Sequence, residues 1–261
     1  MSVLRDLVRH VWPSARGFVR YAFERPDFAW KLLWKRGVYT LTRRLNGSFG
    51  DGRGFVFATF ESLISYWSMF VEGEIQSAAW ADALRTAERP LAVDVGANAG
   101  VFTHMVLLFN PRARVIAFEP QPPMAQKIRD YAVRTGADIQ VIEKAVGAQE
   151  GKAWLCLHHD GDGVAFIADA PAPGLKSRQV DVVTLDRALD GCGPIAVFKL
   201  DVEGHEVEVL QGAAAVLGRA DFLIAEAHTT ADLEALKMQL GGRWSPVRVG
   251  RSDYLFARDS H

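Results

Sequence analysis

The sequence predicts an α/β domain, a mostly parallel sheet with helices on both faces, preceded by a helical extension. From Leu91 onward, short β-rich runs alternate with stretches whose apolar residues have helical spacing. Apolar strands separated by helices are typical of a parallel sheet that is buried on both faces. Before about Pro90 this alternation is absent from the sequence. We therefore expect residues 1–88 to form a mostly helical N-terminal extension and residues 89–261 to form the α/β domain.

In the extension, the pattern predicts helices and one turn region. Apolar residues recur at helical spacing in residues 3–12, 28–41 and 58–84. Residues 45–55 are rich in turn-forming glycine.

In the α/β domain, five strands and three helices are expected. The strands are residues 91–95, 113–119, 139–146, 195–202 and 221–228. The helices are residues 100–109, 122–136 and 205–218. Residues 143–195 are too many for one helix, so we expect extra strands at 152–159 and 179–185 around a loop at 160–165. Residues 244–259 resemble a closing β-hairpin.

Composition narrows the class of protein. The chain has 261 residues, a net charge of −1 and two cysteines, without the Cys/His spacing of a zinc site. No apolar run approaches the roughly 18 residues of a membrane span, and the N-terminus lacks the apolar stretch of a secretory signal. We therefore expect a reduced, cytoplasmic chain.

The segment "LAVDVGANAGVFTHMV" predicts a ligand-binding loop between a strand and a helix. Glycine permits a positive φ and a close approach of the ligand, and a helix N-terminus offers unpaired N–H groups. A dinucleotide fingerprint would need glycine at positions 96, 98 and 101, but the second is Asn98 and the third is Val101. The G-K-[ST] of a phosphate-binding P-loop is also missing. The pattern D-x-G-x-N-x-G instead favours a ligand with an amino-acid end and an adenosine end.

Glu119 closes the next expected strand, in "VIAFEP". A carboxylate in this position can accept two hydrogen bonds from the hydroxyls of a ribose. The alternative is a solvated acid at a strand end, which the loop at the proper distance disfavours.

The motifs "DVGANAGVFT", "VIAFEPQP", "VVTLD", "FKLDVEGHEVEVLQGA" and "LIAEAH", in this order, resemble the FkbM family of S-adenosylmethionine-dependent O-methyltransferases. The resemblance covers about residues 91–228. It implies a Rossmann-like, seven-stranded sheet of order 3-2-1-4-5-7-6 with an antiparallel last strand. It also implies methyl transfer to a hydroxyl of a saccharide or natural product, with S-adenosylhomocysteine as the product. The expected cofactor contacts are Asp94, Gly96, Ala97, Asn98, Gly100, Glu119, Pro120 and Asp201.

The segment "IAVFKLDVEGHE" carries the expected catalytic residues Asp201, Glu203 and His205. Ligands of open α/β sheets bind beyond the carboxyl ends of the strands, and a buried acid needs a partner. A neutral His or a carboxylate can remove the proton of an alcohol, or a divalent metal can acidify the alcohol. We favour base catalysis without a metal; the alternative places a metal on Asp201 and Glu203. His205 has a further interpretation, a local bond at a helix N-terminus.

Lys199 lies inside an expected central strand and needs a carboxylate partner. We expect that partner to be Asp94 or Glu226 on a neighbouring strand. Glu226 and His228 share one face of the last parallel strand, where they either line the acceptor pocket or close the strand end. Residues 158–163, "HHDGDG", are read as a turn rather than a metal site, and as a loop that could contact substrate.

Residues 1–44 are basic, with ten Lys/Arg against three Asp/Glu, and aromatic. Three interpretations stay open: a cap that packs on the core or on a second subunit, an arginine-lined acceptor site, and peripheral attachment to the inner face of a membrane. A nucleic-acid partner is not expected, because the whole chain is nearly neutral and carries no common nucleic-acid motif.

Together these features predict a methyltransferase that modifies a hydroxyl of a small molecule or saccharide. Acceptor specificity is expected to depend on the extension and on residues 144–194. The alternatives are a catalytically silent scaffold, an N- or C-methyltransferase, and a nicotinamide-dependent oxidoreductase, against which the missing glycines argue.

Overall fold

The computed structural model describes residues 22, 25, 28–35, 49–57, 60–72, 75, 78–159 and 164–259. The chain divides into two compact units, Met1–Glu74 and Ile75–His261. The boundary expected from the sequence lies later, after residue 88. The two boundaries differ because helix α5 (Ala78–Thr86) belongs to the second unit, whereas the sequence analysis assigns it to the extension. Its Trp80 ring packs against Phe102 and Phe109 of helix α6 (Val101–Phe109), with ring centroids 5.6 and 5.3 Å apart.

The first unit contains helical residues 28–35 and a short hairpin, which is followed by two short helices. Its named elements are β1 (Phe49–Gly50), β2 (Val56–Phe57), α4 (Phe60–Tyr66) and the π-helix η1 (Trp67–Glu72). Phe28, Phe57 and Tyr66 form its aromatic core, and the buried carboxylate of Asp51 accepts the N–H groups of Arg53 and Phe55 to close the hairpin. The expected turn at 45–55 therefore becomes the β1–β2 hairpin over its described part, whereas the helix expected at 3–12 lies outside the described residues.

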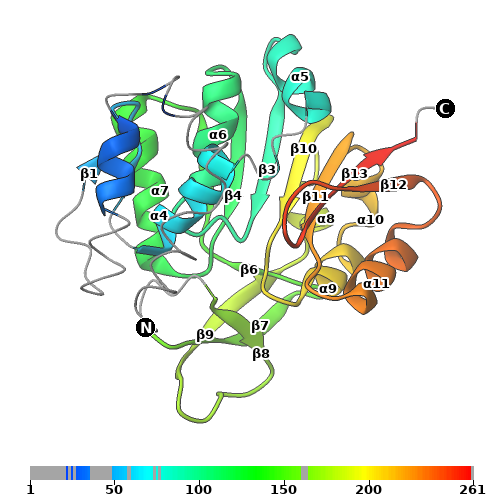
Figure 1. Cartoon of the computed structure of the whole chain (residues 1–261). Coiled ribbons are helices and arrows are strands. Elements are labelled where there is room, and N and C mark those ends of the chain that lie inside the picture. The colour runs from blue at the N-terminus through cyan, green and yellow to red at the C-terminus, as the bar shows by residue number, and fades with distance from the viewer. Residues whose placement is uncertain are drawn as a thin grey trace. The chain divides into compact units, whose positions relative to one another are not determined.

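The second unit is built on a seven-stranded sheet (Figure 1). In spatial order its strands are β12 (Trp244–Arg248), β13 (Asp253–Arg258), β11 (Phe222–Glu226), β10 (Ile195–Leu200), β3 (Leu91–Val95), β4 (Arg114–Phe118) and β5 (Ile139–Ile142). β13 is antiparallel to both of its neighbours, β12 and β11. The remaining pairs, from β11 through β10, β3 and β4 to β5, are parallel. Numbered along the chain and read from β5, this is the expected order 3-2-1-4-5-7-6.

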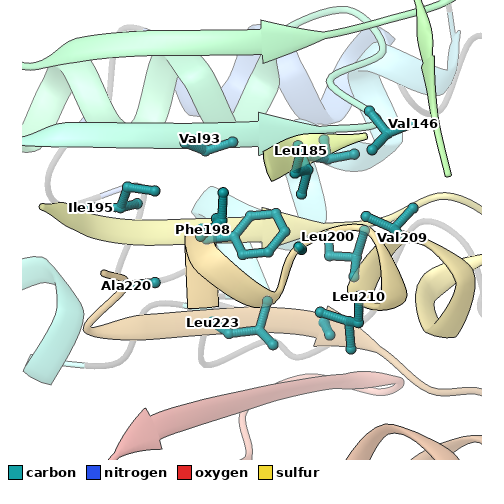
Figure 2. Packing of buried hydrophobic residues seen from close by; sticks show 14 of the residues in the cluster. Val93, Val146, Leu185, Ile195, Phe198, Leu200, Val209, Leu210, Ala220 and Leu223 are labelled. Atoms are coloured by element: carbon teal, nitrogen blue, oxygen red, sulfur yellow. The ribbon is translucent and has the colours of Figure 1, made fainter. Parts of the chain in front are cut away.

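Helices cover both faces of this sheet because alternate strand residues point to opposite sides. Val93, Phe198 and Leu223 face one side, where Figure 2 shows them packed with Leu185, Val209 and Leu210. Ala117 faces the other side and contacts Ile128. Besides α5 and α6, the helices are α7 (Pro122–Thr135), α8 (Leu185–Ala188), α9 (Glu206–Gln211), α10 (Ala214–Leu217) and α11 (Thr230–Leu240).

A second, four-stranded sheet occupies the long connection before β10. Its spatial order is β6 (Ala145–Val146), β9 (Lys176–Val183), β7 (Gly151–Leu157) and β8 (Phe166–Ala168). The two extra strands expected from the sequence correspond to β7 and β9, whereas β8 and α11 were not expected. In the part of the chain that the structure describes, every helix is too short or too polar to cross a membrane.

Candidate active site

The polar residues singled out in the sequence meet at the carboxyl ends of β3, β4, β10 and β11. Leu200 pairs with Val95 on one side and with Ala225 on the other. The next residues along the three adjacent strands, which lie at the same edge of the sheet, are therefore Asp201, Gly96 and Glu226. Ligands of open α/β sheets bind at this edge. We call residues 94–100 and 119–121 the β3–β4 edge, and residues 199–206 and 226–228 the β10–β11 edge.

Close backbone packing explains the glycines of the β3–β4 edge. A Cβ atom on Gly96 would lie 1.7 Å from the carbonyl oxygen of Asp201, and its φ is +76°. Gly100 also has a positive φ, +81°, and begins α6 as its N-cap residue. Asn98 has a φ of 49°, a conformation that asparagine tolerates better than most residues. Only glycine fits at position 96, as the sequence pattern required.

Asp94 is completely buried behind this loop. Its Oδ2 accepts hydrogen bonds from the Thr103 hydroxyl at 2.7 Å and from the Thr103 backbone N–H at 3.2 Å. Burial raises the pKa of the Asp94 carboxyl, while Lys199 and Thr103 lower it. Among the described residues, Oδ1 of Asp94 and Oδ1 of Asn98 are buried and form no hydrogen bond. Two buried acceptors at one loop therefore remain for a donor-bearing ligand.

Glu119 joins the two loops of the β3–β4 edge. Its Oε2 accepts the backbone N–H of Asn98 and its Oε1 accepts that of Gln121, each at 2.7 Å. Burial raises the pKa of Glu119 to about 7, although both N–H groups lower it. Each carboxylate oxygen keeps a further lone pair, so the expected contact with ribose hydroxyls stays compatible with these bonds.

These features fit S-adenosylmethionine better than a dinucleotide. Asp94, Glu119 and Asp201 place three carboxyl groups around the loop, which would repel a pyrophosphate. A ligand with an ammonium group, a sulfonium and ribose hydroxyls suits the same acceptors. The neighbouring residues Ala97 and Pro120 are buried and half-buried, respectively.

The partner of Lys199 differs from the expected one. Its Nζ lies 2.6 Å from Oδ2 of Asp201, and only 4% of its side chain is exposed. The prediction of Asp94 or Glu226 was wrong, because Lys199 and Asp201 are two residues apart and share one strand face. Burial lowers the pKa of Lys199, but Asp201 and Asp94 outweigh this and raise it overall. Lys199 thus balances the charge of two carboxylates.

The loop after β10 is folded by Glu206, which the sequence analysis did not single out. Its buried Oε1 accepts the backbone N–H groups of Val202 and Gly204, at 3.1 and 3.3 Å. Glu203 has a φ of 55°, so its backbone is held in the left-handed conformation, which is uncommon for a residue other than glycine. His205 is the N-cap residue of α9, and its Nδ1 is buried without a hydrogen-bond partner among the described residues.

Glu203, Glu226 and His228 converge at the β10–β11 edge. Their ligand-type atoms lie within 4.8 Å of one another. Burial, first, and then the neighbouring charges of Asp201 and Glu226 raise the pKa of Glu203 to about 7, although His228 lowers it. The alternative metal pair expected from the sequence was Asp201 and Glu203, but Asp201 is held by Lys199 and is not one of these three residues.

Glu226 contacts two side chains. Oε1 accepts the hydroxyl of Ser252 at 2.6 Å, and Oε2 lies 3.3 Å from Nε2 of His228. Ser252 comes from the turn between β12 and β13, and no local sequence signal pointed to it. His158 and His159 lie at the end of β7, and the remainder of the "HHDGDG" segment, residues 160–163, lies outside the described residues.

Comparison with known proteins gives a family match. The model described as "Methyltransferase FkbM domain" matches residues 94–244. Hexuronic acid methyltransferase AglP of Haloferax volcanii is 27% identical over 142 residues, which cover 53% of this chain and 56% of AglP. This chain thus spans little more than half of that relative.

Solved structures that match this chain have low sequence identity and TM-scores below 0.5. Precorrin-6y C5,15-methyltransferase from Geobacter metallireducens is 14% identical with a TM-score of 0.41, over 70% of this chain and 87% of that chain. A putative rRNA methylase from Clostridium thermocellum is 10% identical with a TM-score of 0.44, over 69% and 94% of the two chains.

Proposed function

We propose that this chain, which belongs to the FkbM methyltransferase family, transfers a methyl group from S-adenosylmethionine to a hydroxyl of a saccharide. Methyl transfer follows from the family; the cofactor and the acceptor are the proposal. The observation that carries the cofactor assignment is the β3–β4 edge, where Glu119 bridges two loops beside the unpaired buried oxygens of Asp94 and Asn98.

The residues that would hold the cofactor divide into two groups. Glu119 would accept the ribose hydroxyls with its remaining lone pairs. The loop from Gly96 to Gly100, with the buried oxygens of Asp94 and Asn98, would take the amino-acid end. When bound, S-adenosylmethionine supplies an electrophilic methyl group. The chain contributes alignment, since displacement at a methyl group gains most from holding the reacting atoms in line.

Asp201 belongs to the β10–β11 edge and adjoins the β3–β4 edge. Its backbone N–H donates to Val95 of β3, and its carboxylate is fixed by Lys199. We propose that this fixed carboxylate, together with Glu203 and His205, shapes the boundary between the cofactor and the acceptor hydroxyl.

The saccharide acceptor is supported by the relative named as a hexuronic acid methyltransferase. The β10–β11 edge is also rich in carboxylate and imidazole groups, which bind sugar hydroxyls by hydrogen bonds.

The test is calorimetric titration with S-adenosylhomocysteine of the wild type, of Glu119→Ala and of Glu150→Ala, an exposed glutamate in the second sheet region. We expect micromolar binding in the wild type and in Glu150→Ala, and a loss of at least about tenfold in Glu119→Ala, because an Ala removes two hydrogen-bond acceptors. Labelled methyl transfer to a panel of hexoses and hexuronides then identifies the acceptor. Absence of S-adenosylhomocysteine binding in the wild type would overturn the proposal.

A further inference from the structure

The β10–β11 edge contains several groups able to accept a proton, and their surroundings differ. Asp201, the first of the catalytic residues expected from the sequence, forms an ion pair with Lys199 at 2.6 Å. Protonation of Asp201 would break this ion pair and leave the buried ammonium of Lys199 with less compensation, which is unfavourable. A better catalytic base is a group that lies beside opposite charge once it has accepted the proton.

His228 meets this requirement. Its side chain is 57% exposed at the edge, whereas that of Glu226, which it contacts, is only 17% exposed. The chain on both sides of His228 is fixed: Glu226 ends β11, and the capping box between Thr229 and Asp232 begins α11 immediately after it. The imidazole is therefore open to a ligand while its backbone is anchored.

The contact with Glu226 sets the orientation of the imidazole. Because Nε2 of His228 lies 3.3 Å from the carboxylate, we assign the hydrogen of the neutral imidazole to Nε2 and the free lone pair to Nδ1. Glu226 is itself held by the Ser252 hydroxyl at 2.6 Å. Ser252 of the β12–β13 turn thus contacts Glu226 of β11, and Glu226 contacts Nε2 of His228. This series of contacts leaves Nδ1 of His228 available to a ligand.

Carboxylates face His228 from three elements. Glu226 faces it from β11, Glu203 from the loop before α9, and Asp232 from α11. The pKa values of Glu203 and Glu226 are raised first by burial, and a positive charge on His228 lowers both. A proton that reaches His228 during the reaction therefore arrives beside carboxylates of opposite charge.

We propose that His228 is the general base that removes the proton of the acceptor hydroxyl, and that Glu226 and Ser252 are positioning residues that present its Nδ1. This rests on the proposed O-methyl transfer. The hydroxyl proton passes to Nδ1, the oxygen electron pair forms the new bond to the methyl carbon, and the electron pair of the broken carbon–sulfur bond remains on sulfur. The imidazolium then returns its proton to water.

The kinetic test uses His228→Asn, Glu226→Gln and Ser252→Ala, with p-nitrophenyl β-glucuronide as the probe. We expect kcat to fall at least about 100-fold in His228→Asn, about tenfold in Glu226→Gln and a few-fold in Ser252→Ala, with KM changed less than about threefold. The acidic limb of the pH profile of kcat should disappear in His228→Asn. The matched controls are Glu234→Gln on the exposed face of α11 and Ser245→Ala on β12, which should keep the wild-type kcat.

A second readout does not depend on turnover. Nitrogen-15 NMR, with the His228 signals assigned by their loss in His228→Asn, reports which imidazole nitrogen carries the hydrogen. We expect a single Nε2–H form in the wild type and a mixture of both forms in Glu226→Ala. Should the probe not be methylated, this measurement still decides the orientation.

Titration with S-adenosylhomocysteine separates this proposal from the proposed function. Loss of kcat with unchanged affinity in His228→Asn supports the base, whereas absence of binding in the wild type defeats the proposed function. Retention of more than half of the wild-type kcat in His228→Asn overturns the proposal, as does a wild-type mixture of the two imidazole forms. Activity that EDTA abolishes and Mg²⁺ restores would also overturn it, because His228 would then act as a ligand.

Discussion

The two edges of the site hold their carboxylates in different ways. At the β3–β4 edge, Asp94 and Glu119 are buried: Glu119 accepts backbone N–H groups from the loops that directly follow β3 and β4, and Asp94 accepts the backbone N–H and the hydroxyl of Thr103 in the first turn of α6. At the β10–β11 edge, Asp201 and Glu226 are partly exposed and are fixed by the side chains of Lys199 and Ser252. Backbone donors define one geometry for one ligand, whereas side-chain partners can be exchanged. The difference suits an invariable cofactor on one side and a variable acceptor on the other.

The largest effect should come from Gly96→Ala, which tests whether the two edges depend on each other. The added Cβ would overlap the carbonyl of Asp201, so one edge or both must move. We expect S-adenosylhomocysteine affinity to fall at least about 100-fold and the free energy of unfolding to fall by about 3 kcal/mol. Gly136→Ala is the control: its φ is +68°, with nothing within 4 Å of the added Cβ, and it should cost only about 1 kcal/mol. Equal losses in the two variants would show that backbone strain, not the contact with Asp201, is the cause.

Removal of the buried charge of Lys199 should have the next largest effect. Lys199→Met leaves Asp94 and Asp201 uncompensated, and we expect a loss of about 2–3 kcal/mol in urea unfolding at pH 7, discounted because the Asp201 side chain is 34% exposed. Lys152→Met, which removes an exposed pair with Asp181, should change the stability by less than about 0.5 kcal/mol. A Lys199→Met variant as stable as Lys152→Met would mean that Asp94 and Asp201 are not both charged.

The pH dependence of cofactor affinity sharpens the comparison, because it depends on the β3–β4 edge alone. With the pKa of Glu119 raised to about 7, its carboxylate is mostly protonated at pH 6 and mostly ionised at pH 8. Hydroxyl donors prefer the ionised form, so affinity for S-adenosylhomocysteine should be about tenfold higher at pH 8 than at pH 6. In Glu119→Gln this dependence should vanish; if it persists, another group is responsible.

The smallest effect is expected at the β10–β11 edge, from Glu203→Gln. The pKa of Glu203 is about 7 in the folded chain against a usual 4.5, so the folded state resists ionisation and loses stability as the pH rises from 4.5 to 7. A glutamine cannot ionise, so the variant should be about 1 kcal/mol more stable at pH 8, an amount discounted for partial exposure, and unchanged at pH 4. Thermal unfolding at both pH values measures this. Glu208→Gln, an exposed glutamate on α9, is the matched control and should show no such gain.

The same contrast explains what the sequence could predict. The glycines at 96 and 100 and the acid at 119 follow from local patterns, and the structure places them together. The predicted partner of Lys199 was wrong, because the prediction paired charges across neighbouring strands, whereas Asp201 lies two residues along the same strand face. Ser252 could not be found, since its contact with Glu226 depends on the antiparallel pairing of β11 and β13. Helix α11 was detectable from its capping box but was overlooked.

The contact between Gly96 and the carbonyl of Asp201 also has a consequence for protein engineering and for divergence within the family. A variant library aimed at new acceptors gains nothing from position 96, since any side chain there disturbs the cofactor loop and the strand end together. Under the proposed function, diversity is better introduced at the turn between β12 and β13, which carries Ser252 and contacts Glu226. Substitutions in that turn leave the loop after β3 unchanged.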